Sequence, residues 1–195
     1  LVIFDLDNTL ADETHFLFAG YEAAAAVAAA GDSPRAAVVA RWLQRAFLES
    51  GRAQLFERMV ETFPDAVGGM PEWLSALRSA RVPGGLRFLD WVAPFCDRLA
   101  DLPLAILTNG NVGQQRNKFQ QLVPSGLRDR FMLCCAADHI PKPHPAGLLF
   151  LLRRHRCLPH EALYIGDTEV DEACAAAAEV PFAWAPAAGA PPWTR

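Results

Sequence analysis

Two acids one residue apart stand near the start of the sequence, in the segment FDLDNTL at residues 4–10. They are Asp5 and Asp7, and they follow the apolar run LVIF. On an extended segment residues i and i+2 point to the same side, so both carboxylates could address one ligand while Leu6 faces the core. One carboxylate of such a pair can attack a substrate while its neighbour transfers protons. An exposed turn is the alternative interpretation, because Asp, Asn and Thr are common in turns and helix caps.

Polar residues also follow three later apolar runs. Thr108 and Asn109 follow LAIL, Lys142 lies in IPKPHP, and Asp167 and Asp171 lie in GDTEVD after LYI. In an open parallel sheet, ligands bind beyond the carboxyl ends of the strands, so these are the positions where a site would form. The last two acids stand at i and i+4 and would share one face near a helix N-terminus, although ordinary helix capping explains that pair equally well.

The acids in these segments would need a counter-charge. Convergence of the segments would bring up to four carboxylates into one crevice, those of Asp5, Asp7, Asp167 and Asp171. Like charges that close are costly unless a cation neutralises them. All-oxygen ligands without a suitable Cys or His cluster favour Mg²⁺ over zinc. Lys142 and the Thr108 hydroxyl would then offer a charge and a donor to an anionic ligand, for which phosphate is the natural candidate.

The elements that must position these residues form a regular alternation of apolar runs and helical patterns. We expect strands at residues 1–6, 104–108, 131–136, 163–166 and 181–185, and helices at 86–100, 112–123, 146–157 and 170–179. Short apolar runs joined by helices indicate parallel strands with crossover connections. The predicted fold class is therefore α/β, a doubly wound parallel sheet.

Between the first two strands the alternation stops. Residues 11–83 hold four stretches with apolar residues at helical spacing, separated by Gly or Pro breaks, and no convincing strand. A segment of this length is too long for an ordinary loop. We expect a helical cap domain at 12–84 inserted into a core of residues 1–11 and 85–195. The end of the chain, APAAGAPPWTR, is predicted to be an irregular tail.

Composition narrows the class of protein and its partners. A chain of 195 residues with 52% hydrophobic residues can bury a sizeable core. The net charge of -4 and scattered arginines disfavour nucleic acid as a partner, and no apolar stretch is long enough to span a bilayer. We expect a cytoplasmic monomer or homodimer that acts on a small molecule and keeps its five cysteines reduced. Because Leu1 already lies inside a strand pattern, we also expect the natural chain to begin earlier.

The four polar segments together resemble the four motifs of the haloacid dehalogenase superfamily, in its phosphatase branch with a helical cap after the first motif. DLDNT is similar to the family's Asp-x-Asp-x-Thr motif and LTNG to its Thr motif. KPHP is similar to its Lys motif and GDTEVD to its Gly-Asp-x-x-x-Asp motif. The motifs occur in the family's order and cover the core from start to finish. The resemblance implies a Rossmann-like core with an α-helical cap.

The resemblance also implies roles for the motif residues. Asp5 would attack phosphorus to form an aspartyl phosphate, and Asp7 would protonate the leaving group and then activate water. Thr108 and Lys142 would hold the transferring phosphoryl oxygens, and Asn109 would add a backbone donor.

A metal and a recognition role follow from the same resemblance. Mg²⁺ would be bound by the Asp5 carboxylate, the Asp7 backbone carbonyl and Asp167, with support from Asp171. Substrate choice in capped members lies largely in the cap and in the segment after the first motif. There His15, near the hinge, is the best candidate for substrate contact.

The motifs are also compatible with other activities. Asp7 argues against a 2-haloacid dehalogenase, because the resembled dehalogenases lack an acid there and need no metal. Asn8 separates the chain only weakly from sugar phosphate mutases, which usually have Gly at that position. A non-catalytic module that binds a phosphorylated ligand is the alternative from another class. Against that module, every motif residue is present.

Overall fold

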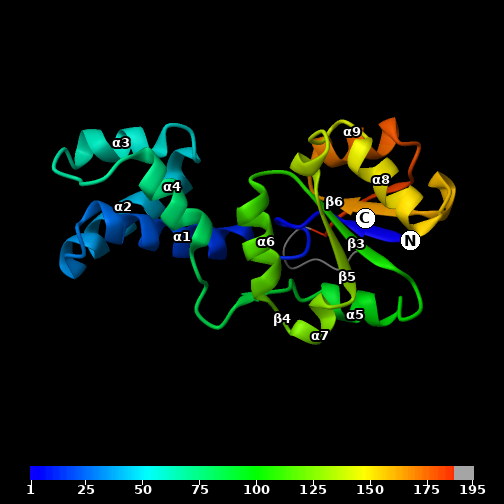
Figure 1. The fold of residues 1–195 in the computed structure, drawn as a ribbon. Helices are drawn as coiled ribbons and strands as arrows, with labels where there is room; N and C mark the ends of the chain where they lie inside the picture. Colours follow the sequence, from blue (N-terminus) through cyan, green and yellow to red (C-terminus); the bar gives the residue numbers. More distant parts are fainter. Residues whose placement is uncertain (187–195) are drawn as a thin grey trace. The chain divides into compact units, whose positions relative to one another are not determined.

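The computed structural model describes residues 1–186, and the expected irregular tail lies largely outside them, at 187–195. The described chain divides into two compact units, Leu1–Glu13 with the segment from Gly85 onward, and Thr14–Gly84. Each unit has its own buried core, and Figure 1 shows their elements. Among residues 1–186, no helix has the length and apolar character needed to cross a membrane.

The first unit is built on a five-stranded parallel sheet in the order β5-β3-β1-β6-β7. The central strand β1 (Val2–Phe4) pairs with β3 (Leu104–Thr108) and β6 (Leu163–Gly166). The outer strands are β5 (Phe131–Cys135) and β7 (Phe182–Trp184). The carboxyl ends of β3, β1 and β6 are therefore adjacent. This sheet confirms the predicted α/β class.

Helices cover both faces of this sheet. α8 (Ala146–His155) and α9 (Glu169–Ala177) lie on one face, and α5 (Val92–Asp97) and α7 (Ser125–Arg128) on the other (Figure 1). Successive strand residues point to opposite faces, so Ile3 packs in the cluster that includes α8 and α9. Phe4 instead contacts the ring of Phe95 in α5, at 6.2 Å between centroids.

Two predicted helices differ from the structure. The expected helix at 86–100 is wrong over its first half, because Leu86–Arg87 forms a short strand, β2, and α5 begins only at Val92. β2 pairs with β4 (Leu122–Val123), which replaces the end of the expected helix at 112–123. The helix there, α6 (Val112–Gln121), ends where Leu122 becomes extended, with φ of -60° and ψ of 130°, and pairs with Leu86 of β2. Short 3₁₀ turns at Ala136–Asp138 and Pro159–Glu161 complete the described elements of this unit.

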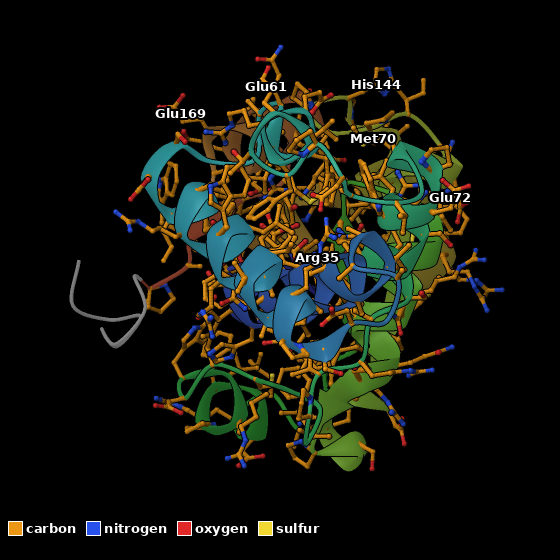
Figure 2. The ribbon with its side chains drawn as sticks, turned by 90° about the vertical axis from the view of Figure 1, so that its left-hand side faces the viewer. Arg35, Glu61, Met70, Glu72, His144 and Glu169 are labelled. Atoms are coloured by element: carbon orange, nitrogen blue, oxygen red, sulfur yellow. The ribbon has the colours of Figure 1, made fainter. Side chains whose placement is uncertain are left out.

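Four helices form the second unit. They are α1 (Glu13–Ala28, from Thr14 onward), α2 (Ser33–Ser50), α3 (Leu55–Thr62) and α4 (Met70–Ser79). Asp32 caps α2 by accepting from the backbone N–H of Arg35. The Arg35 guanidinium pairs with Asp65 after α3 at 2.5 Å, and Figure 2 labels Arg35 on α2. Glu72 caps α4 by accepting from the Gly69 N–H at 3.0 Å. These caps fix where α2 and α4 begin.

Candidate active site

The carboxyl ends of the three central strands carry the polar residues that the sequence singles out. Asp5 directly follows β1, Thr108 ends β3, and Asp167 directly follows β6. Asn8, with φ of 58°, turns the chain after β1 and accepts from the Glu13 N–H through its side chain at 3.1 Å. Asn tolerates this left-handed conformation better than most residues. The result is a compact loop that keeps the first acids at the strand end.

Lys142 links the ends of these strands through the hydrogen bonds of its ammonium group. Its side chain is 3% exposed, and its Nζ donates to Oδ1 of Asp5 and to Oδ1 of Asp171, both at 2.6 Å. The same Nζ lies 3.0 Å from the Tyr164 hydroxyl and 3.3 Å from the Leu107 carbonyl oxygen. A buried ammonium with this many acceptors is well compensated. One lysine thus holds together carboxylates from two separate segments.

Asp171 divides its two oxygens between a helix cap and the site. Oδ2 accepts from the Thr168 N–H and hydroxyl at 3.1 and 2.6 Å, which caps the start of α9. Oδ1 accepts from Lys142 and from the Tyr164 hydroxyl, the latter at 2.7 Å. Gly166 leaves room for this arrangement, since a Cβ there would lie 2.5 Å from Cβ of Asp171. The capping and site interpretations of this acid are therefore compatible.

Asp167 completes a cluster of three carboxylates. Oxygen atoms of Asp5, Asp167 and Asp171 lie within 4.8 Å of one another. Thr9 is fully buried and donates its hydroxyl to Oδ1 of Asp167 at 3.1 Å, which fixes that carboxylate. An all-oxygen set of this kind suits a hard divalent cation. Within residues 1–186 this is the one group of His, Cys, Asp or Glu side chains arranged in that way.

Asn109 acts in the structure mainly through its side chain. Its Nδ2 donates to the Lys142 carbonyl at 3.0 Å, and its Oδ1 accepts from the Lys142 N–H at 2.9 Å. This reciprocal pair fixes the backbone that carries the lysine. Thr108 is buried, and its hydroxyl donates to the Asn109 carbonyl at 3.3 Å.

Asp7 lies in a separate set of contacts. Both of its carboxylate oxygens accept from Nζ of Lys118, each at 2.8 Å. Oδ2 also accepts from Nε2 of Gln115 at 3.0 Å, and Lys118 reaches Oε1 of Glu13 at 3.2 Å. Each acid of the FDLDNTL segment therefore has its own buried lysine.

The remaining predicted site residue is His15. It is the third residue of α1, it is exposed, and it belongs to the helical unit. Its role as a substrate contact stays a prediction.

Burial and charge shift the pKa values in the cluster in opposite directions. Burial raises the pKa of Asp5 to about 7 against the pull of Lys142, and the charges of Asp171 and Asp7 add to the rise. Burial likewise raises the pKa of Asp167, although the Thr9 hydrogen bond opposes it. For Asp171 burial acts upward too, but the charge and hydrogen bond of Lys142 bring its pKa below the ordinary value.

The lysine responds in the complementary way. Burial alone would lower the pKa of Lys142, but the charges of Asp5 and Asp171 outweigh it and raise the pKa. Lys142 therefore stays charged, while Asp5 is held as an anion only weakly without a further cation. Perturbation of this kind, caused by burial and specific partners, is typical of functional sites.

Sequence reasoning missed three residues of the site. Tyr164 lies within an apolar strand, and its hydroxyl group was the only feature that could have indicated a role in the site. Gln115 and Lys118 lie on α6, in a stretch without an apolar stripe, so no periodic signal marked their face as buried. The buried residues of α6 are in fact polar, spaced at i, i+3 and i+6: Gln115, Lys118 and Gln121.

Comparison with protein-family models gives a match over residues 2–185, to the haloacid dehalogenase-like hydrolases. This match spans nearly all of the chain and confirms the family resemblance drawn from the motifs. The comparison with curated proteins gave no significant match.

Solved structures with the same architecture include hydrolases of this superfamily. A subfamily IA, variant 1 hydrolase of the haloacid dehalogenase superfamily from Geobacter sulfurreducens is 26% identical, with a TM-score of 0.64 over 94% of this chain and 85% of that one. A candidate phosphoglycolate phosphatase from Lactobacillus plantarum is 22% identical, with a TM-score of 0.59 over 94% and 84%. A family hydrolase from Deinococcus radiodurans, solved with phosphate and sodium, is 21% identical with a TM-score of 0.57 over 94% and 79%. The last two share the fold.

Proposed function

The chain belongs to the haloacid dehalogenase-like hydrolase family, and on that premise we propose that it is a magnesium-dependent phosphatase acting through an aspartyl phosphate. The substrate class is a phosphate monoester of a small metabolite. The observation that carries the proposal is the cluster of three carboxylates around Lys142, a single cation that contacts two of them. Such a cluster needs a divalent cation before it can receive an anionic phosphate.

The metal fits the residues present. The donor set of Asp5, Asp167 and Asp171 contains oxygen alone, as Mg²⁺ prefers, and the backbone carbonyl of Asp7 is the further proposed ligand. When bound, the metal would neutralise charge on the carboxylates and on the phosphoryl oxygens.

The chain's own residues would carry out the chemistry in two steps. Asp5 attacks phosphorus in line, and the bond from phosphorus to the ester oxygen breaks as Asp7 gives that oxygen its proton. Asp7 then takes a proton from water, which attacks the aspartyl phosphate and releases inorganic phosphate. Lys142 and Thr108 hold the transferring phosphoryl oxygens through both steps.

Asp7 decides between phosphate ester hydrolysis and dehalogenation in this proposal. A halide leaves without being protonated, whereas an alkoxide needs an acid. Asp7 lies two residues after the nucleophile candidate in sequence, and its charge raises the pKa of Asp5. An acid at this position is therefore useful for a phosphatase.

The helical unit is assigned the role of a cap that selects the substrate, with boundaries near residues 12 and 84, and His15 as its proposed contact. Phosphoglycolate belongs among the candidate substrates because one structural neighbour carries that name. We also propose that the reaction takes place in the cytoplasm.

The test is a phosphatase screen with a panel of metabolite phosphates, phosphoglycolate included, with and without Mg²⁺. We expect turnover that requires the metal and is lost in Asp5→Asn. Halide release from 2-haloacids in the presence of a chelator would contradict the proposal. Absence of turnover above the Asp5→Asn control for every ester would favour a binding module instead.

A further inference from the structure

Lys118 is a cation placed where lysines are rarely found. It lies on α6 and its side chain is fully buried, with an exposed fraction of 0%. Lysine is almost never fully buried unless it is paired, because removing the ammonium from water is costly. Its partners are two carboxylates, those of Asp7 and Glu13. None of the four family motifs contains this lysine.

The contacts of Lys118 fix how the Asp7 carboxylate is turned. The two Nζ to Oδ distances are both 2.8 Å, so the ammonium sits evenly between the oxygens. Gln115 lies one turn earlier on the same helix and adds a donor to Oδ2 at 3.0 Å. The start of α6 is itself capped by Asn111, which accepts from the Gln114 N–H at 3.0 Å. A capped helix therefore presents two donors to one carboxylate.

The same lysine closes the loop that carries Asp7. Glu13 begins α1, and its backbone N–H donates to the Asn8 side chain at 3.1 Å. Its carboxylate meets Lys118 at 3.2 Å. The loop is thus held at both ends, at Asp7 and at Glu13, by one ammonium group. Loss of that group would free the Asp7 carboxylate to turn, while the Glu13 N–H to Asn8 and the Thr9 to Asp167 hydrogen bonds would still hold the loop.

We propose that Lys118 is a positioning residue for Asp7, which it holds by both carboxylate oxygens in the orientation needed to transfer a proton to the leaving group. The inference deepens the proposed function and rests on it, because it assumes that Asp7 is the acid. Lys142 serves the nucleophile in the parallel way, so the two acids are oriented by separate lysines from separate segments. A misoriented acid would slow proton transfer and leave attack by Asp5 in place.

A pair of esters with different leaving groups separates these steps. 4-Nitrophenolate leaves readily without a proton, whereas benzyl alkoxide needs one, and kcat/KM reports the steps up to departure of the leaving group. We expect Lys118→Met to lower kcat/KM for benzyl phosphate by about tenfold to a hundredfold and to change that for 4-nitrophenyl phosphate by less than about threefold. A merely structural role would lower both values by the same factor.

Control variants isolate the contact with Asp7. Arg116→Met removes a cation on the same helix that pairs with Asp138 at the surface, and it should leave both esters unaffected. Lys118→Arg keeps the charge and should restore most of the activity on benzyl phosphate. In an Asp7→Asn background, Lys118→Met should cause no further selective loss, because its effect passes through that carboxylate.

Lys118→Met leaves two carboxylates without their cation, so its folding must be checked by circular dichroism. If it does not fold, Gln115→Leu decides, because it keeps the cation and removes one donor to Asp7. It also removes the contact of that donor with the Asn109 carbonyl, which has no part in proton transfer and so should affect both esters alike. That variant should show a smaller loss of the same selective kind. Equal losses on both esters in a folded variant would overturn the positioning role alone. If the wild-type protein hydrolyses neither ester nor any metabolite phosphate, the proposed function fails, and the positioning role with it.

Discussion

The ammonium group of Lys142 lies 2.6 Å from Oδ1 of Asp5, although 137 positions separate the two residues in the sequence. Even so, burial outweighs this contact and raises the pKa of Asp5 to about 7, with the charges of Asp171 and Asp7 contributing. The ion pair therefore does not fully offset the loss of water around the carboxylate. Without a further cation, the charged form of Asp5 costs the fold stability.

This cost has a definite pH dependence. The ordinary pKa of the carboxyl is 3.8 and the folded value is about 7. Between these values the folded protein keeps a proton that the unfolded chain releases, so wild-type stability falls as pH rises through this window. An asparagine at position 5 does not titrate in this range. The free energy of unfolding of Asp5→Asn should therefore rise relative to that of wild type as the pH increases from 3.8 to about 7. Urea unfolding in a chelator at both ends of the window measures the difference, and a constant difference would contradict the prediction.

Gly166 sets the room available to Asp171, and a methyl group there should disturb both stability and turnover. A Cβ at this position would lie 2.5 Å from Cβ and 2.8 Å from Oδ2 of Asp171, the atom that caps α9. We expect Gly166→Ala to cost about 1–3 kcal/mol of stability, as overpacking does, and to lower turnover with it. Gly126→Ala is the matched control, because a Cβ there meets nothing within 4 Å. Equal changes in the melting temperatures of the two variants would rule out this explanation.

Asn109 should matter to activity through the backbone of Lys142. Removing its side chain breaks two hydrogen bonds, at 3.0 and 2.9 Å, that fix this backbone. We expect Asn109→Ala to lower kcat/KM for 4-nitrophenyl phosphate by about tenfold, because a small displacement of a catalytic group is costly. The accompanying loss of stability should be about 1–3 kcal/mol. Unchanged activity in a destabilised variant would show that Asn109 contributes to stability alone.

The central strands could be predicted from the sequence because they are buried on both faces. β3 and β6 occupy Leu104–Thr108 and Leu163–Gly166, the same bounds as the apolar runs that predict them. The region at 86–100 could not be predicted in this way. Its helical spacing is genuine only from Val92, while Leu86–Arg87 is strand because it pairs with a segment further along the chain. A two-residue strand carries no periodicity of its own.

Some residues of the candidate site could likewise be predicted from the sequence, and others could not. Asp5, Lys142 and Asp171 could be picked out because each polar residue interrupts or follows an apolar run. Lys118 could not, because a lysine among the polar residues of α6 reads as solvent-exposed. Its burial depends on two carboxylates from a distant segment, so the pairing exists only once the chain has folded.

The cluster of Asp5, Asp167 and Asp171 should bind Mg²⁺ even in the absence of substrate. A ligand that binds the folded state alone stabilises it by about 2.7 kcal/mol at a hundred times its Kd, so Mg²⁺ should raise the melting temperature of the wild-type protein. Asp167→Asn removes one of the three clustered carboxylates and should reduce this shift, while retaining the fold. Asp138→Asn, at an exposed surface pair, should keep the full shift. Because metal binding competes with protons on Asp5, the shift should also grow as pH rises toward about 7. A melting temperature indifferent to Mg²⁺ across this range would remove the metal from the proposed mechanism.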